Sequence, residues 1–446
     1  MKRKKHGRKL SSTQMIAIVF AAIILVGSAL LMLPVASRSG EGCGFLDALF
    51  TATSATCVTG LVRFDTGSQW TVFGQAVILI MIELGGLGFM SVASLVVFAL
   101  RRKVGLKQRM VMAQALSLDE MDGVVTLQKW VLGGSLSIQA VAALVLFCRF
   151  MPLFGAGKAA WYGLFHAVSA FCNAGFDVFG YGDSIVRFNN DPVVSITLMV
   201  LVVVGGLGFF VWEEVARLRS FRKFSVYTKL VLISTLVLLL SGALAFCITE
   251  WNGPAFAGMT PRQKILNGFF QSVTVRTAGF DSVGQGLLTD GGKGVSIALM
   301  LVGGASGSTA GGAKIVTMVV LVLFLWSRAR GRNSVCVFKR TIAQDKVLDA
   351  MTIVGLLVGL AVFGAIFISA TSPIGFTDGL YEAVSALATV GLTTGVTTAL
   401  SIPAQILITV YMYFGRVGVL TISLGFLMAD RAEDRFRYAQ TNILIG

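Results

Sequence analysis

Four short segments of this 446-residue chain share one pattern, an aromatic residue followed ten positions later by a glycine. Glycine lets the backbone approach an ion closely, and a ring of backbone carbonyls can replace the water that a cation sheds on entering a pore. No Asp or Glu stands next to these glycines on their N-terminal side, so the pattern favours a monovalent cation. The segments are LFTATSATCVTGL (49–61), LFHAVSAFCNAGF (164–176), GFFQSVTVRTAGF (268–280) and LYEAVSALATVGL (380–392), with the pairs Phe50 and Gly60, Phe165 and Gly175, Phe269 and Gly279, and Tyr381 and Gly391.

Each segment begins with about a dozen helix-compatible residues, too few to cross a hydrocarbon core of about 30 Å. We therefore expect a half-helix that enters the membrane and returns through a loop between two full spans. Non-helical backbone at membrane depth must be lined by protein or water, so four such loops around one axis would line a pore. The C-terminal ends of the half-helices would direct partial negative charge toward a cation in that pore.

The composition, 55% hydrophobic and 13% charged, is that of an integral membrane protein rather than a soluble domain. Eight apolar runs are long enough for a transmembrane helix. We predict an all-α fold with eight transmembrane helices and four re-entrant half-helices, in four repeats at 1–105, 106–225, 226–335 and 336–446. The predicted spans are Met15–Leu33, Val72–Leu100, Trp130–Met151, Val193–Val215, Thr228–Thr249, Val295–Trp326, Val347–Thr371 and Ile402–Met428.

The positive charges, which give a net charge of +15, lie in every second segment between spans and at both ends. This positive-inside pattern places both termini in the cytoplasm and the four glycine segments on the outer side, and it argues against a nucleic-acid surface. The apolar run after the basic N-terminus is as long as a full span, so we expect an uncleaved first helix rather than a signal peptide. The basic clusters are residues 1–9, 101–109, 217–229, 328–340 and 430–437.

A second glycine-rich feature lies in the span that follows each glycine segment. Two interpretations stay open: small residues that allow close helix packing, or a further part of the repeated unit. The four copies are GGLGF (85–89), GGLGF (205–209), GGASG (303–307) and FGRVG (414–418).

The third copy extends into GGASGSTAGGAK (303–314), which interrupts the sixth predicted span. A phosphate-binding loop is excluded because no strand precedes the segment and Lys314 is followed by Ile315. Glycine-rich chain breaks a helix, so we predict a mobile gate below the pore loops; a helix kink packed by small residues is the alternative. No chemistry of its own is assigned to Lys314. The predicted gate residues are Gly303, Gly304, Ser306, Gly307, Ser308, Thr309, Gly311, Gly312, Lys314 and, from the last span, Arg416.

Arg416 lies in the middle of the last predicted span, where an ionised side chain requires water or a partner. A guanidinium that faces the pore would repel a passing cation. The structural alternative is an ion pair with Glu83, and the two roles are compatible.

Two other classes of function compete with a channel-like pore. A coupled secondary transporter also uses broken helices, but four loops that enter from one face favour a channel over inverted repeats. An enzyme would need clustered catalytic groups, whereas the chain has two histidines and no metal-ligand spacing. The six cysteines include no CxxC pair, and Cys43 on the outer side has no evident disulfide partner.

The sequence resembles the Trk/Ktr/HKT superfamily of potassium-translocating subunits, most closely the Ktr-type membrane subunit of bacteria. The likeness covers almost the whole chain and rests on the set LLMLP, DTGSQWTVFGQ, ELGGLGF, RTAGF and YFGRVG. It implies one selectivity-filter glycine in each of four pore units, at Gly60, Gly175, Gly279 and Gly391. Some sodium-carrying plant members have Ser at the first of these positions, so Gly60 favours K⁺.

The resemblance also assigns the residues around the filter glycines to ion binding. Cys57 and Cys172 depart from the Thr or other polar residue that we expected there. The predicted ion-binding residues are Thr56, Cys57, Val58, Thr59, Gly60, Cys172, Asn173, Ala174, Gly175, Arg276, Thr277, Ala278, Gly279, Thr389, Val390 and Gly391.

The same resemblance implies that Arg416 is a permeation barrier and that the protein is a homodimer with one pore in each protomer. The dimer would sit on a cytosolic ring of Rossmann-type (RCK) regulatory subunits that bind ATP or ADP, in the bacterial plasma membrane. K⁺ is the expected cargo, Na⁺ is a candidate activator, and no organic cofactor is expected in this chain. The basic inner loops suit such a partner and suit anionic lipid equally well.

Overall fold

The structure is a computed structural model that describes residues 12–88, 124–332 and 334–418. Three of the basic clusters, 1–9, 101–109 and 430–437, lie outside these residues. So do the C-terminal parts of the predicted spans Val72–Leu100 and Ile402–Met428. The described chain is helical apart from loops and one short hairpin, which confirms the predicted all-α class.

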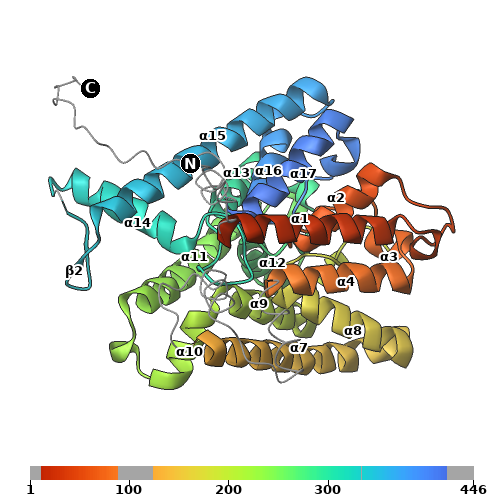
Figure 1. Ribbon diagram of the computed structural model, residues 1–446, viewed down its shortest axis with the longest axis horizontal. Helices are drawn as coiled ribbons and strands as arrows, with labels where there is room; N and C mark the ends of the chain where they lie inside the picture. The colour runs from red at the N-terminus through yellow and green to blue at the C-terminus, as the bar shows by residue number, and fades with distance from the viewer. Residues whose placement is uncertain (1–11, 89–123, 333, 419–446) are drawn as a thin grey trace, which may run out of the picture.

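Four long apolar helices form the frame of the molecule (Figure 1). Within the described residues, these four are long and apolar enough to cross a membrane, and the number rises to five if α9 and α10 are taken as one bent span. The four long helices are α1 (Ser12–Leu31), α7 (Val124–Phe154), α11 (Val226–Glu250) and α15 (Gln344–Thr371).

A half-length helix follows each long helix and packs against it. Each of the four ends four or five residues before its glycine, at a residue buried inside the molecule. Their side chains are buried toward the C-terminal end, which matches a helix that descends into the centre of the protein. The half-helices are α2 (Phe45–Thr56), α8 (Ala156–Phe171), α12 (Pro261–Thr274) and α16 (Phe376–Leu387).

A third helix then leads away from each glycine loop, and a side-chain N-cap fixes where it begins. The hydroxyl of Thr71, Thr289 or Ser401, or the carboxylate of Asp191, accepts a backbone N–H of the first turn. Such caps satisfy donors that the helix itself leaves unpaired. The third helices are α4 (Val72–Gly86), α9 (Pro192–Gly206), α13 (Asp290–Met300) and α17 (Ile402–Val417).

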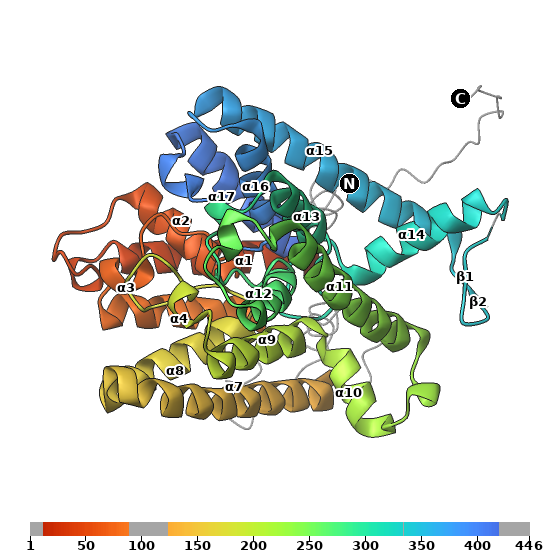
Figure 2. The ribbon, with the colours of Figure 1, turned by 180° about the vertical axis from the view of Figure 1, so that it is seen from behind.

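The units close into a circle. Each third helix contacts the half-helix of the following unit: α4 contacts α8, α9 contacts α12, α13 contacts α16, and α17 returns to α2 at the start of the chain. Figures 1 and 2 show the units packed around one centre, with the first and last units side by side. This arrangement brings the four glycine loops together.

Two predicted spans are not continuous helices. Val193–Val215 was expected as one span, but it divides into α9 and α10 (Phe209–Leu218), which meet at 94°. Gly208, with φ of +89°, makes the bend, and Phe209 N–H donates to Gly307 O at 2.9 Å. Val295–Trp326 divides into α13 and α14 (Ile315–Ala329), separated by residues 301–314.

Short elements complete the described chain. The hairpin of β1 (Cys336–Val337) and β2 (Arg340–Thr341) pairs antiparallel between α14 and α15, an addition to the predicted all-α fold. The remaining short helices are α3 (Thr66–Gln69) and the 3₁₀ turns η1 (Pro34–Ala36), η2 (Val186–Phe188), η3 (Phe221–Lys223), η4 (Pro254–Phe256), η5 (Gln285–Leu287) and η6 (Val396–Ala399).

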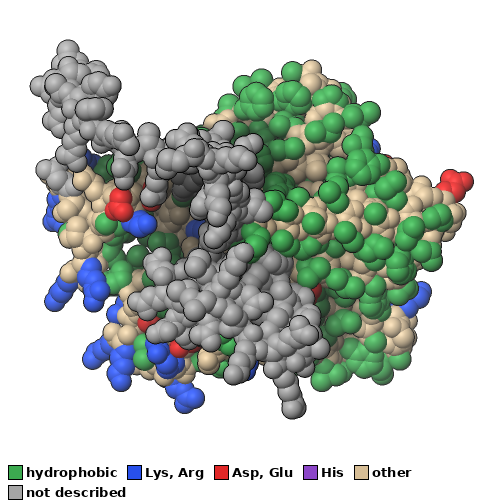
Figure 3. Space-filling model, viewed as in Figure 1, with side chains coloured by type: hydrophobic (Ala, Val, Ile, Leu, Met, Phe, Trp, Pro, Cys, Tyr) green, Lys and Arg blue, Asp and Glu red, His purple; other side chains and the backbone are tan. Residues whose placement is uncertain are grey.

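The surface is apolar along the long helices. Leu144, Leu244, Ile248 and Val322 are each more than 60% exposed, as expected for side chains that face lipid. Figure 3 shows hydrophobic side chains spread over one side of the molecule and Lys and Arg gathered at the end that carries α10 and the hairpin. The chain is therefore an integral membrane protein with a basic end.

Candidate functional site: a ring of four glycine loops

All four loops share one unusual backbone conformation. In each, the glycine predicted for the filter and the residue two positions before it have positive φ, from +50° to +99°. Three of the earlier residues, Val58, Thr277 and Thr389, are β-branched, and such residues rarely adopt positive φ. The fourth is Asn173, for which this conformation is easier. The repeated strain marks the loops as a functional site.

The four glycines form a closed ring. A side-chain Cβ added to Gly60 would lie 2.5 Å from Ala174 O, one added to Gly175 would lie 2.8 Å from Ala278 O, and one added to Gly279 would lie 2.6 Å from Val390 O. A Cβ on Gly391 would collide with Thr59 O and so complete the circle. Each glycine is thus required because the carbonyl of the next loop occupies the space of a side chain.

Hydroxyl groups at the ends of the half-helices hold the loops. Ser54 Oγ accepts Gly60 N–H at 3.0 Å, and Ser385 Oγ accepts Gly391 N–H at 3.1 Å. In the other two units, Ser169 Oγ donates to Phe176 O at 2.8 Å and Thr274 Oγ1 donates to Phe280 O at 2.6 Å. These residues were missed from the sequence, although each lies four positions after a buried aromatic residue: Phe50, Phe165, Phe270 and Tyr381.

This spacing corrects the register of the third unit. Phe269 was predicted to match the other aromatic residues, but it is 39% exposed, whereas Phe270 is buried. The glycine follows the hydroxyl residue after six positions in three units and after five in the third, from Thr274 to Gly279. Alignment on the glycine therefore places the half-helix one residue out of register.

The other predicted ion-binding residues surround the ring in different ways. Thr59, Ala174, Ala278 and Val390 supply the carbonyls that face the neighbouring glycines. Cys57 and Cys172 cap the half-helices α2 and α8. The Arg276 side chain points away, because its guanidinium donates to Thr235 O in α11. Within the described residues, four buried threonine hydroxyls near the ring have no hydrogen-bond partner: Thr56, Thr59, Thr277 and Thr389.

The segment 301–314 lies directly against the residues that precede the glycines. Gly311 is packed so closely on Thr389 that a Cβ there would collide with the threonine side chain. Thr309 Oγ1 donates to Phe171 O at 3.1 Å, and Thr309 N–H donates to Gly205 O at 3.2 Å. The segment thus bridges the second and fourth units on the inner side of the ring.

The remaining residues predicted for the gate form hydrogen bonds and contacts that fix the shape of this segment. Gly303 N–H donates to Ala313 O at 2.8 Å, and Ser308 Oγ donates to Ala305 O at 2.6 Å. Lys314 Nζ donates back to Ala310 O at 2.8 Å, and Gly312 lies against Ala388 with φ of +67°. Gly304, Ser306 and Gly307 accept hydrogen bonds on their carbonyls from Ile315 N–H, Tyr227 OH and Phe209 N–H.

Arg416 connects this segment to α4. Its guanidinium donates to Thr309 O, Gly85 O and Gly86 O, the last at 3.1 Å. The alternative pairing with Glu83 is not formed, because the Glu83 carboxylate accepts from Gln139 Nε2 at 3.2 Å and from Cys172 Sγ at 3.2 Å. The charge of Arg416 is therefore held by backbone carbonyls beneath the ring.

The second glycine-rich feature, at 85–89, 205–209 and 414–418, contacts the C-terminal ends of the half-helices. A Cβ on Gly85, Gly205 or Gly415 would collide with the carbonyl of the last half-helix residue, Thr56, Phe171 or Leu387 respectively. Close packing is thus one of its roles. The feature also ends or bends the third helices at glycines with positive φ: Gly88, Gly208 and Gly418.

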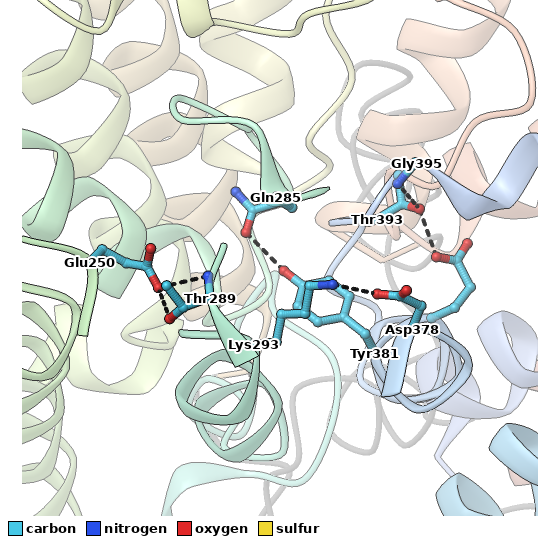
Figure 4. Close-up of polar contacts among 9 residues, drawn as sticks. Glu250, Gln285, Thr289, Lys293, Asp378, Tyr381, Thr393 and Gly395 are labelled. Carbon is cyan, nitrogen blue, oxygen red and sulfur yellow. Dashed lines mark hydrogen bonds and ion pairs between the residues drawn. The ribbon is translucent and has the colours of Figure 1, made fainter. Parts of the chain in front are cut away.

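Polar groups brace the outer side of the third and fourth units (Figure 4). Tyr381 OH donates to Gln285 Oε1 at 2.8 Å, and Lys293 pairs with Asp378 at 2.8 Å. The buried Glu382 accepts from Thr393 Oγ1 at 2.7 Å, in the loop that follows Gly391. These contacts fix the outer loops relative to the half-helix α16.

Asp177, two residues after Gly175, lies in the outer loop of the second unit. Burial, followed by the nearby Asp65 carboxylate, raises the pKa of Asp177 to about 7. Its carboxylate accepts Phe179 N–H at 3.3 Å. A pKa near 7 places the titration of this group close to neutral pH, in the loop that follows Gly175.

Four strained glycine loops thus meet in a circle, and the segment 301–314 packs against them. The family model of the cation transport protein TrkH matches residues 1–435. The chain belongs to the TrkH family. The family membership confirms the predicted resemblance to the Trk/Ktr superfamily and the prediction that the protein is not an enzyme.

Two relatives of this TrkH-family chain match along nearly their whole length. The potassium/sodium uptake protein NtpJ of Enterococcus hirae is 39% identical, with all of this chain and 99% of the relative covered. The Ktr system potassium uptake protein B of Bacillus subtilis is 37% identical over 98% and 97%. The crystal structure of the potassium transporter TrkH from Vibrio parahaemolyticus shares the fold, with a TM-score of 0.72 over 95% of this chain and 86% of that one, at 17% identity.

Proposed function

We propose that the protein takes up K⁺ across the bacterial plasma membrane through the ring of glycine loops. The observation that carries the proposal is the circular closure of the ring, in which each glycine faces a carbonyl oxygen of the next loop. A ring of backbone carbonyls can replace the hydration water of a dehydrated alkali cation, and the unpaired threonine hydroxyls beside the ring are further candidate ligands. The names of the relatives from Enterococcus hirae and Bacillus subtilis support K⁺ as the cargo.

In this proposal the inner segment 301–314 is the gate, and Arg416 holds it in the closed position. The segment packs on Thr389, and Arg416 ties its Thr309 carbonyl to α4, so the path below the ring is closed in this arrangement. The positive guanidinium adds a repulsive barrier to a cation. Opening requires the segment to leave these contacts.

The proposed topology has four repeats, eight spans, four half-helices that enter from outside, and both termini in the cytoplasm. The basic end of the molecule supports this orientation, because Lys and Arg favour the cytoplasmic side. Half-helices that enter from one face support a channel-like path over a coupled transporter with inverted repeats. We also propose a homodimer regulated in trans by a cytosolic nucleotide-binding ring, with Na⁺ as a candidate activator. The word 'system' in the names of the Ktr relatives supports an assembly of more than one component.

Complementation of a K⁺-uptake-deficient bacterium at low K⁺ tests the function. Wild type, supplied with a regulatory subunit, is expected to restore growth. Gly279→Ser is expected to lower the uptake rate at least tenfold, because its Cβ would lie 2.6 Å from Val390 O. Rubidium uptake in the same cells measures the rate directly.

Gly294→Ser is the matched control for this substitution. Gly294 is in α13 of the same unit, and a Cβ there meets no atom within 4 Å. It is expected to support growth like the wild type. A wild type that fails to rescue despite correct membrane insertion would contradict the proposed function.

A further inference from the structure

A cavity of about 670 Å³ lies at the basic end of the molecule, away from the ring. Its walls are the turn between α10 and α11 on one side and the hairpin of β1 and β2 on the other. Figures 1 and 2 both show these two elements at the same end of the protein. The lining includes Arg222, Lys223 and Lys229 from the turn and α11, and Phe338 and Arg340 from the hairpin.

The described lining of the cavity is positively charged without compensation. Four Lys or Arg residues line it, and none of the described residues that line it is Asp or Glu. Within the described parts of the chain, none of the four forms an ion pair with a carboxylate. The nearby Glu214, which accepts from Ser225 N–H at 2.6 Å and from Ser225 Oγ at 2.8 Å, is not part of the lining, and its one negative charge leaves the four positive charges in excess. The cavity therefore attracts an anion.

The cavity also lies at the level of lipid headgroups. Lys229 belongs to the first turn of α11, which starts at Val226 as an apolar helix long enough to span a bilayer. Phe221 and Phe338 flank Lys229, with each ring centre 5.9 Å from its Nζ, and they are 47% and 48% exposed. Exposed Phe side chains beside Lys and Arg are a combination found in segments that lie at the membrane surface, where the apolar rings enter the boundary between headgroups and acyl chains.

From this geometry we infer that the cavity between the α10–α11 turn and the hairpin binds a phosphate group, chiefly that of an anionic lipid headgroup. Arg222, Lys223 and Arg340 would contact the phosphate oxygens, because guanidinium and ammonium groups form strong charge-assisted hydrogen bonds with phosphate. Phe221 and Phe338 would contact the lipid backbone or acyl chains.

The site is connected to the inner segment 301–314. Tyr227 follows the cavity residue Val226, and its hydroxyl donates to Ser306 O at 3.1 Å. The α10 helix, tied to α11 through Glu214, also contacts the segment, where Phe209 N–H donates to Gly307 O. A bound headgroup would therefore stabilise the wall against which the segment is packed.

Native mass spectrometry of the purified full-length protein tests the binding with equal amounts of phosphatidylglycerol and phosphatidylcholine. Wild type is expected to retain phosphatidylglycerol at least threefold over phosphatidylcholine. The triple variant Arg222→Gln, Lys223→Gln, Arg340→Gln is expected to lose that preference. The control triple Arg330→Gln, Arg332→Gln, Lys346→Gln removes three exposed charges outside the cavity lining and is expected to keep it.

One further measurement identifies the source of the anion. Inorganic phosphate is added at constant ionic strength, and the unfolding temperature is measured. If phosphate raises the unfolding temperature of wild type but not that of the triple cavity variant, the site is supported with a soluble phosphate as its ligand. Single Arg340→Gln in the exposed hairpin repeats each measurement if the triple variant is unstable. Two results would overturn the inference. One is that wild type and the cavity variants bind lipid and phosphate equally. The other is that the cavity variants lose binding to an acidic peptide such as polyglutamate but keep their binding to lipid and phosphate.

Discussion

Single residues carry the strain of the ring. A β-branched residue at positive φ costs about 1–3 kcal/mol, and Val58, Thr277 and Thr389 all adopt this conformation. The hydroxyls of Ser54, Ser169, Thr274 and Ser385 hold the same loops in place. The protein thus maintains an unfavourable backbone at four equivalent places, which a structure without function at this site would not require.

Arg416 offers the sharpest test at this scale. Neutralisation as Arg416→Gln is expected to raise K⁺ flux about tenfold, which corresponds to about 1.4 kcal/mol of barrier, because a positive charge and three carbonyl contacts are lost together. Flux into proteoliposomes is the measurement.

Arg416→Lys separates the two causes. If repulsion dominates, the lysine variant keeps a low flux. If the tether to Thr309 and Gly85 dominates, the lysine variant conducts like the glutamine variant. An unchanged or lower flux in a well-folded Arg416→Gln protein would rule out both roles.

Asp177 predicts a pH dependence of stability. Its pKa of about 7 in the folded protein lies above the ordinary value of 3.8, so folding favours the protonated group. Its contribution to the free energy of unfolding therefore falls as pH rises between those two values and stays low above 7. Asp177→Asn is expected to raise the unfolding temperature in detergent more at pH 8 than at pH 5. The same gain at both pH values would contradict the assignment.

At the scale of elements, the sequence predicted which four loops come together, but not the register of the third half-helix. The four glycines locate the loops correctly because only glycine fits beside the neighbouring carbonyls. The third half-helix was placed one residue out of register, since the shorter link from Thr274 to Gly279 leaves no trace in an alignment on glycine. The spacing from a buried aromatic residue to Ser or Thr would have found it.

Two other features could not be predicted because their causes lie far away in the chain. The bend between α9 and α10 is stabilised by hydrogen bonds to residues 305–309, about one hundred positions later. The partners of Arg416 are backbone carbonyls, which carry no side-chain signature. Glu83, the partner expected from charge alone, is instead held by Gln139 and Cys172.

The contact between the inner segment and the ring can be tested with one methyl group. Gly311→Ala places a Cβ against Thr389, so the segment 301–314 must move away from the ring. We expect a flux several times that of wild type, measured in proteoliposomes. Gly355→Ala in α15 is the control, because a Cβ there meets no atom within 4 Å. Equal flux in both variants would contradict a gate at this contact.

At the scale of the molecule, contacts between units repeat in a circle. The order in which α4, α9, α13 and α17 reach the next half-helix is the order in which the glycines face the next carbonyl. The circle explains why residues near both ends of the described chain are needed to complete one site. Tyr413 OH, for example, donates to Ala17 O at 2.7 Å.

The orientation of the molecule can be tested with its own cysteines. Cys43 lies in the loop before α2, and Cys336 lies in the hairpin at the basic end. The hydroxyls of Thr341 and Ser334 lower the pKa of Cys336, whereas burial raises that of Cys43, so Cys336 reacts faster when it is reached.

A membrane-impermeant maleimide is therefore expected to label Cys43 in intact cells and Cys336 only after permeabilisation. Cys43→Ser and Cys336→Ser identify the two labels by mass spectrometry. Labelling of Cys336 in intact cells would reverse the proposed orientation.

The circle of non-identical loops has a consequence for how such a protein can change. In a tetramer of identical subunits, one codon substitution alters every quarter of the assembly at once. Here each quarter is encoded by its own part of the gene, so a mutation can change one quarter and leave the other three unchanged. The link from Thr274 to Gly279, one position shorter than the corresponding link in the other three units, is a difference confined to one quarter, and it shows that the circle tolerates asymmetry.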